Sequence, residues 1–447
     1  MPAQVCRRWR RLILGSASHL RLCLVCTEGT PVADMLAHSP PLPLIIDYQV
    51  DHHKVTAGDE EGIMLALQRR DRVRRISLRV ETIRSLQKII TAINDEFLIL
   101  EFLSIVAPSN HNENFILPST FEAPQLRILI LTHFASLIGS PSLTTAVGLS
   151  VLSLQWIRPS IYPHPDHLHP NQLLQTLSLL PHLETLKICF HSPQDFTRHH
   201  IRTQLLNAPI ITHVTLPNLY RFDFSGVNIY LEALLPHMTA PLLKHLRVQF
   251  YAELTFYVPH LLQFMTTADN FKFNLIKFSF HEAAISVVVG TNEDSFFVDV
   301  FCGTLDWQLS AVAQIFSVLG PLFSDVVELI LDYRQHSISS ERDHQANRTL
   351  WRELLGSFRN VKTLQVHNGL VRDLSRCLRL DGAPPLELLP ELTKLICPVG
   401  SVKGKIFSSF IHKRKVVGKP VKLIGKTAGR RRYKFHSPNG TYGIDFD

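Results

Sequence analysis

Histidine and cysteine are the residues best suited to metal or redox chemistry in this chain of 447 residues, which contains 23 His and 7 Cys. His164, Asp166, His167 and His169 lie together in the run YPHPDHLHP, and imidazole and carboxylate groups so close in sequence are typical metal ligands. Three Pro in nine residues indicate a loop, where neutral imidazoles are common. We therefore expect no metal site here.

Cys23 and Cys26 have the C-x-x-C spacing of zinc and thiol–disulfide sites. They lie in the strand-like run HLRLCLVC, where residues three apart point to opposite faces of a strand. No second Cys pair is present to complete a zinc site. The sequence therefore predicts two unrelated thiols and no bound cofactor.

Two runs approach catalytic motifs without completing them. HEAAI, at residues 281–285, has Ile285 where a zinc protease needs its second His. The run Gly425–Lys426–Thr427 follows Pro420, at a position where a phosphate-binding loop requires Gly. G-x-S-x-G does not occur. We predict no catalytic residues and a protein that is not an enzyme.

The elements that would position any site follow a repeat, L-x-x-L-x-L with an apolar residue at each L. Nine copies start at Val73, Leu126, Leu183, Leu219, Leu243, Leu275, Val326, Val361 and Leu392, and three weaker copies start at Phe97, Leu149 and Phe297. Five copies have Pro two residues earlier, which suits the entry to a strand; these are Pro124, Pro181, Pro217, Pro241 and Pro390.

Helical patterns separate these strands, with apolar residues three or four apart. The clearest span residues 83–93, 173–180, 309–319, 350–358 and 370–378. Strand and helix thus alternate with a period near 30 residues. We expect an α/β fold: over residues 31–402, a leucine-rich-repeat-like curved solenoid with a parallel sheet inside and helices outside. The alternative is a doubly wound α/β sheet, which would favour Gly-rich turns at the strand ends.

Charge is distributed unevenly along the chain. Residues 403–447 hold twelve Lys or Arg and two acids, whereas residues 12–402 hold 30 basic and 36 acidic side chains. Nucleic-acid binding by this body is disfavoured, because neutralising phosphates requires clustered basic residues. For the basic tail, 403–447, we expect a solvated extension; the alternatives are a nuclear address or a nucleic-acid contact.

Cysteine usage and hydropathy restrict the location. An odd number of scattered Cys indicates reduced thiols and hence a cytoplasmic or nuclear protein. The longest apolar stretch, residues 97–107, is interrupted by Glu101 and is far shorter than the roughly 20 residues that cross a bilayer. We therefore expect no membrane segment.

The N-terminal run VCRRWRRLIL carries the most specific motif. Val5, Cys6, Trp9 and Leu12 form a V-C-x-x-W-x-x-L pattern that resembles the closing helix of an F-box. The segment TEGTPVADMLAHSPPLPLIIDY and the tail FIHKRKVVGKPVKLI are similar to the corresponding parts of F-box proteins of mushroom-forming fungi. The alternative is a simple amphipathic basic helix.

The resemblance implies that residues 1–30 are the C-terminal remnant of an F-box, which docks on the Skp adaptor of a cullin–RING ubiquitin ligase. Four residues precede Val5, whereas the adaptor-contacting L-P-x-E part of an F-box should come before this helix. We therefore expect the F-box to be N-terminally incomplete, and residues 1–447 to bind the adaptor weakly.

In this architecture the sheet lines the concave side, and the residues flanking each buried strand pair face a partner. The predicted partner-binding residues are Lys187, Arg221, Asp223, His245, Arg247, Lys277, Glu328, Asp332, Gln365, His367 and Lys394. Their mixed charge favours a protein surface over phosphate. The expected function is a substrate receptor holding an unidentified target protein; the alternative is a scaffold without a ubiquitin connection.

Overall fold

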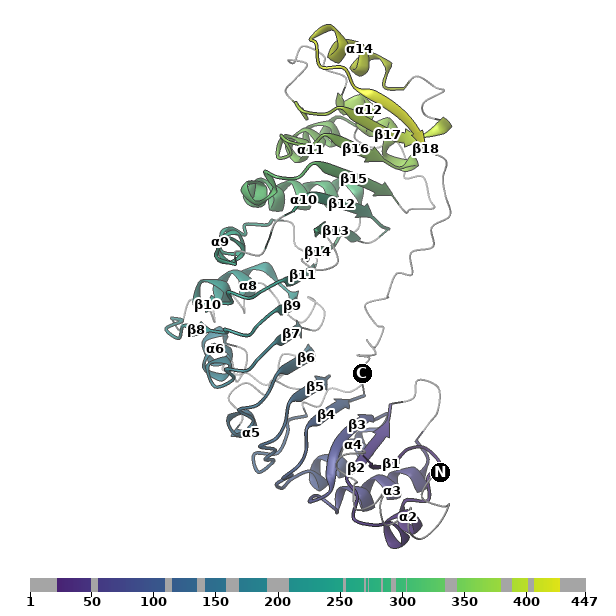
Figure 1. Cartoon of the computed structure of the whole chain (residues 1–447), viewed down its shortest axis with the longest axis vertical. Helices are drawn as coiled ribbons and strands as arrows, with labels where there is room; N and C mark the ends of the chain where they lie inside the picture. The colour runs from purple at the N-terminus through teal and green to yellow at the C-terminus, as the bar shows by residue number, and fades with distance from the viewer. Residues whose placement is uncertain are drawn as a thin grey trace.

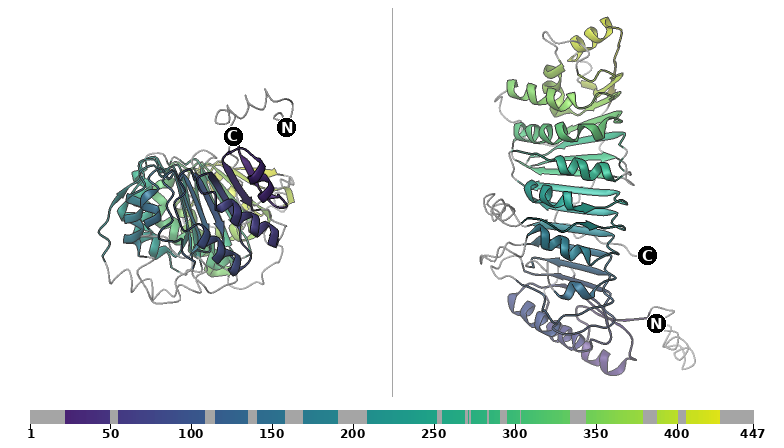
Figure 2. Two further views of the ribbon diagram at one scale, coloured as in Figure 1. Left: turned by 90° about the horizontal axis from the view of Figure 1, so that it is seen from below. Right: turned by 90° about the vertical axis from the view of Figure 1, so that its left-hand side faces the viewer.

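The chain forms one large open sheet of sixteen strands, as the computed structural model shows (Figure 1). The strands stack along a curved body, and Figures 1 and 2 place the helices on its outer side and the sheet on its inner, concave side. The α/β class is therefore confirmed. The structure describes residues 22–49, 55–108, 115–134, 141–157, 169–190, 209–251, 255–268, 271, 273–282, 284–290, 295–302, 304–333, 344–378, 388–400 and 406–426.

The first seven strands are parallel and follow each other in chain order. They are β1 (Leu24–Cys26), β2 (Leu44–Tyr48), β3 (Val73–Arg79), β4 (Phe102–Val106), β5 (Ile128–Thr132), β6 (Val151–Ile157) and β7 (Thr185–Phe190). The helices between them are α2 (Val32–His38), α3 (Ala57–Leu67), α4 (Ile83–Ala92), α5 (Pro141–Thr145) and α6 (Pro170–Ser178).

The strand order then departs from the chain order. β9 (Arg221–Gly226) and β11 (His245–Tyr251) continue the parallel series, but the next strand in space is β14 (Ser295–Phe301). β13 (Ala284–Gly290) and β12 (Leu275–Phe280) follow, so the chain crosses to β12 and returns through β13. β13 is antiparallel to both neighbours. The sheet is therefore mostly parallel, and the expectation of a purely parallel sheet is wrong at this strand.

Beyond the reversal, parallel chain order resumes. The last strands are β15 (Glu328–Tyr333), β16 (Thr363–Val366), β17 (Lys394–Pro398) and β18 (Lys422–Lys426). The helices of this half are α8 (Asn228–Leu234), α9 (Pro259–Thr267), α10 (Leu305–Leu319), α11 (His344–Gly356), α12 (Val371–Leu378) and α14 (Ser408–Val416), with 3-10 helices η3 (Leu235–His237), η4 (Gly320–Phe323) and η5 (Asn368–Leu370). A separate pair, β8 (Val214–Thr215) and β10 (Met238–Thr239), lies on the helix side (Figure 1).

Most repeat registers are confirmed by burial. In the copy starting at Leu183, that residue, Leu186 and Ile188 are all buried, as an apolar face packed under helices requires. Three registers are wrong. The copies starting at Leu275 and Phe297 assign these two half-exposed residues to the core. The copy starting at Phe97 assigns the half-exposed Phe102 to a buried strand position. The buried strand residues in these places are Leu103, Ile105, Ile276, Phe278, Phe280, Phe296, Val298 and Val300.

The five prolines before the repeats lie in β-turns and not at strand entries. Leu183 N, for example, donates to Leu180 O at 3.2 Å across Pro181. The same bond spans Pro124, Pro217, Pro241 and Pro390. Because the ring of Pro fixes φ near the value needed at the second position of such a turn, each proline favours a turn shortly before a strand.

The sheet extends beyond the expected limits of 31 and 402 at both ends. β1 lies within residues 1–30 and pairs with β2, and β18 lies within residues 403–447 and pairs with β17. Arg414 of α14 is fully buried, and its guanidinium donates to the carbonyls of Pro390 and Leu392 at 2.9 and 3.1 Å. Residues 22–30 and 406–426 therefore belong with the sheet.

Candidate functional site on the open face of the sheet

All eleven predicted partner-binding residues lie on or directly after strands of the sheet, at positions that alternate with buried core residues. Because strand side chains alternate between the two faces, these residues point away from the helices. We call this surface the open face. Lys394 is exposed, Asp223 and Asp332 are 8% exposed, and the other predicted residues are half-buried.

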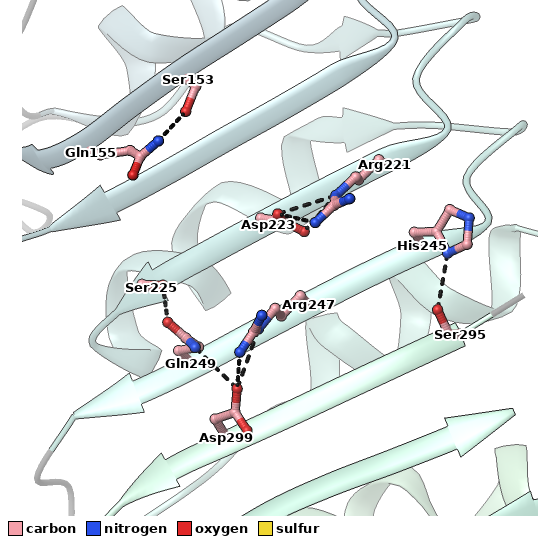
Figure 3. Close-up of polar contacts among 10 residues, drawn as sticks. All are labelled: Ser153, Gln155, Arg221, Asp223, Ser225, His245, Arg247, Gln249, Ser295 and Asp299. Atoms are coloured by element: carbon pink, nitrogen blue, oxygen red, sulfur yellow. Dashed lines mark hydrogen bonds and ion pairs between the residues drawn. The ribbon is translucent and has the colours of Figure 1, made fainter. Parts of the chain in front are cut away.

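Two arginine–aspartate pairs lie at the centre of the open face (Figure 3). Arg221 binds Asp223 on its own strand with nitrogen–oxygen distances of 2.9–3.2 Å. Arg247 binds Asp299 on the neighbouring strand at 2.8 Å. Each pair holds a guanidinium in a fixed orientation, since several charge-assisted hydrogen bonds join the two groups.

Polar neighbours extend the second pair. Gln249 Nε2 donates to Asp299 at 3.0 Å, and Ser225 Oγ donates to Gln249 Oε1 at 2.7 Å. His245 Nδ1 lies 2.9 Å from Ser295 Oγ (Figure 3). The central network thus spans β9, β11 and β14, and its side chains are joined to one another by hydrogen bonds and ion pairs.

Lys187 lies beside this network, on β7, in register with Asp223. Burial lowers the pKa of the Lys187 amine; the Asp223 carboxylate opposes this shift, and the cations of Arg247 and Arg221 add to it. Three basic side chains therefore converge on three adjacent strands around the carboxylates of Asp223 and Asp299.

A second polar group lies nearer the C-terminus. Asp332 is 3.5 Å from both Lys277 Nζ and His367 Nδ1. Gln365 Nε2 lies 2.8 Å from His367 Nε2, and Lys426 Nζ donates to Gln365 Oε1 at 3.3 Å. Glu328 and Lys394 occupy one row, each in register with Thr363.

The structure does not bring the central and C-terminal groups into contact. Between Arg247 and Lys277 the same row across the sheet contains Phe297 and Val288, contributed by β14 and β13. Both are half-exposed. The reversed strand order thus inserts apolar side chains of β13 and β14 between the central network and the polar group around Asp332.

Sequence reasoning missed four polar residues of the central network: Ser225, Gln249, Ser295 and Asp299. Asp299 directly precedes the buried residues Val300 and Cys302 of the weaker copy that starts at Phe297, and no partner-binding residue was predicted from the weaker copies. The alternation in SFFVDVF would have identified it, since Phe296, Val298 and Val300 are the buried set.

The other chemical motifs prove structural where they are described. His169 Nδ1 accepts from Asn171 N at 3.1 Å and so caps α6, while His164, Asp166 and His167 lie outside the described residues. In HEAAI, His281 and Glu282 follow β12, and Ala284 and Ile285 begin β13, so these described residues do not form a helix. Burial raises the pKa of the Cys26 thiol to about 11, which keeps it protonated at neutral pH.

In the part of the chain that the structure describes, no group of three or more His, Cys, Asp or Glu is arranged to hold a metal ion. No helix in this part of the chain is long and apolar enough to cross a bilayer. Val5, Cys6, Trp9 and Leu12, the predicted adaptor-binding residues, lie outside it.

Comparisons with known proteins do not assign a function to the open face. No protein-family model matches the chain, and no curated protein gives a significant match.

Proposed function

We propose that this chain is a non-catalytic protein-interaction subunit, a leucine-rich-repeat-like solenoid that holds a target protein on its open face. We further propose that it is a substrate receptor of a cullin–RING ubiquitin ligase. The observation that carries the first proposal is the arrangement of the described residues: their helices lie along one face of the sheet, and the other face presents polar, charged and apolar side chains in register.

A mostly parallel sheet is usually covered on both faces, because both are apolar. Here the open face combines ion pairs such as Arg247–Asp299 with half-exposed apolar residues such as Ile330 and Ile396. Such a mixture is typical of a protein–protein interface, whose apolar centre is surrounded by polar groups. The fixed arginine orientations favour binding further, since less side-chain freedom is lost on association.

Site-specific crosslinking tests the open face. A photo-reactive phenylalanine replaces Phe297 on the open face or, as a matched control, Trp307 on α10, which is 55% exposed. We expect crosslinked partner proteins from position 297 and far fewer from position 307. Equal yields from both positions would contradict the assignment of the open face.

The connection to ubiquitin rests on the resemblance of Val5, Cys6, Trp9 and Leu12 to the end of an F-box. The test compares residues 1–447 with the same chain carrying the earlier helices of a standard F-box ahead of Val5. We expect weak co-purification of the Skp adaptor with the first chain and strong co-purification with the second, because affinity concentrates in the buried centre of an interface. Trp9→Ala should weaken the grafted complex, and a grafted chain that binds no adaptor would favour the scaffold function.

A further inference from the structure

The open face has one row of side chains that begins with basic residues and becomes mainly apolar, and a pair of lysines lies next to its apolar end. From β7 onward, its members in spatial order are Lys187, Asp223, Arg247, Phe297, Val288, Lys277, Ile330, Gln365, Ile396 and Ile424. Next to its far end, Lys394 and Lys422 lie in register with each other, and both are exposed. One basic end, with Lys187 and Arg247, and the other, with Lys394 and Lys422, therefore enclose a half-exposed and mainly apolar middle.

We propose that the open face binds an extended acidic–apolar–acidic segment of a partner protein, which lies across the strands from Lys187 to Lys422. This inference rests on the proposed function of the open face and specifies its partner. Charge complementarity and the apolar middle together define the segment's chemistry.

Basic residues exceed acidic ones on the open face although the body of the chain is acidic overall. The basic residues on strands of this face are Arg75, Arg79, Lys187, Arg221, Arg247, Lys277, Lys394, Lys422 and Lys426. The acidic ones are Asp47, Asp223, Asp299, Glu328 and Asp332. Asp223, Asp299 and Asp332 form ion pairs with Arg221, Arg247 and Lys277. Because nine basic residues face five acidic ones, the open face as a whole carries a net positive charge, which attracts carboxylates.

The spacing of the basic ends sets the length of the segment. Nine strand-to-strand steps separate β7 from β18 in the sheet. At about 4.8 Å a step they span roughly 43 Å, which an extended chain of about 13 residues covers. A shorter acidic peptide would reach only one basic end and would lose the binding free energy contributed by the other end.

Nucleic acid fits this row less well than an acidic protein segment. Its backbone carries a charge at every phosphate and binds where several cations cluster. Here the middle of the row contains Phe297, Val288 and Ile330 with a single cation, Lys277, among them.

The experiment measures binding of fluorescent peptides to the full chain by anisotropy, at low and moderate salt. The main probe is a 13-residue peptide with four acidic residues at each end and five apolar residues between them. Its controls are an isomer with the acidic residues in the middle, a version with Lys for each acid, and a 13-nucleotide single-stranded RNA. We expect the main peptide to bind at least about tenfold more tightly than its isomer, and more weakly as salt rises.

Variants locate the binding. Lys187→Gln should weaken binding about tenfold, since its amine is partly desolvated, and Lys394→Gln or Lys422→Gln about threefold each. Lys415→Gln, on an exposed residue of α14, removes the same charge and should change nothing. Unchanged melting temperatures confirm that the variants fold.

Several outcomes would overturn the inference and leave the proposed function separately testable. Equal binding of the isomer, tighter binding of the lysine peptide or the RNA, or indifference to Lys187→Gln each contradicts the acidic–apolar–acidic partner. If the lysine peptide binds and Lys187→Gln changes its affinity, the open face remains a protein-binding surface, but its partner is not acidic. If no probe binds, the inference fails, and crosslinking at position 297 still decides whether the open face binds a protein.

Discussion

The stretch from β1 to β7 and the stretch from β11 to β15 are built from the same repeat but pair their strands differently. In the first, which we call the regular stretch, each strand lies beside its predecessor in the chain, and the open face carries serines such as Ser104 and Ser153 as well as charged residues such as Arg75. In the second, the β12–β13 hairpin reverses the order, and β14 pairs with β11 across a gap of more than forty residues. A uniform repeat thus tolerates an inserted antiparallel hairpin.

The comparison teaches that a core pattern and a strand neighbour are separate properties of a segment. Alternation determines which side chains a strand buries, and burial was correctly predicted for Leu186 and Leu329 in both stretches. The partner across the sheet depends on the path of the chain. Substitutions in matched pairs can separate the two properties.

The largest expected effect distinguishes the two faces of β14. Val298→Asp places an unpaired carboxylate in the core and should cost several kcal/mol of unfolding free energy, as should Leu186→Asp in the regular stretch. Phe297→Asp, on the half-exposed side, should cost about 1 kcal/mol or less. Chemical denaturation checks all three variants, and a reversed ranking at 297 and 298 would contradict the register of β14.

A second prediction concerns the C-terminal end of the sheet. Arg414→Ala removes the donor to two carbonyls and leaves a cavity, so we expect a loss of about 3 kcal/mol. Lys415→Ala, one residue away and exposed, should be nearly neutral. Thermal denaturation of the two variants provides the comparison; similar stabilities would show that α14 does not anchor the last strands.

An intermediate effect is expected on the open face itself. Arg247→Ala leaves the Asp299 carboxylate, whose side chain is 13% exposed, without its cation, and should cost about 2 kcal/mol. Gln155→Ala in the regular stretch removes only a neutral hydrogen bond to Ser153 of 2.9 Å and should cost less than about 1 kcal/mol. Urea denaturation measures both, and equal losses would remove the distinction between the two stretches.

The smallest effect is a pH dependence in the regular stretch. The Thr56 hydroxyl, and then the N–H groups of Gly29 and Thr56, bind the Asp59 carboxylate and hold its pKa below the ordinary value, although partial burial opposes them. The folded state thus binds this proton less tightly than the unfolded state. The contribution of these hydrogen bonds to the free energy of unfolding is therefore present above the ordinary carboxyl pKa. It is lost as pH falls through the lowered pKa of Asp59 in the folded state.

Thr56→Ala removes this helix cap and should cost about 1 kcal/mol near neutral pH. The difference in unfolding free energy between the variant and the unmodified chain should shrink as pH falls from 7 toward 3, because the Asp59 carboxylate becomes protonated in both the folded and the unfolded state. The free energy of unfolding of both chains, measured at each pH, tests this prediction. A constant difference would show that the Thr56–Asp59 interaction does not depend on the carboxylate charge.

Much of the fold and part of the candidate site could be predicted from residue patterns. The helices over 309–319 and 370–378, and most buried triplets, follow from apolar periodicity because a soluble chain must bury those faces. Glu328 and Lys394 were correctly placed on strands by the same argument. Asp299 and Gln249 were missed because their roles depend on which strands are neighbours, and local alternation does not specify this.

The sequence by itself determined the alternation of strand and helix, the residues that form the core and the uneven charge of the chain, since each depends on residues close together in the chain. Only the tertiary structure decided that β14 lies beside β11, that Arg247 pairs with Asp299 and that Phe297 separates two basic ends of the open face. The physical reason is that backbone hydrogen bonding accepts any extended partner of suitable length. The choice among partners comes from the packing of the whole sheet and its helices.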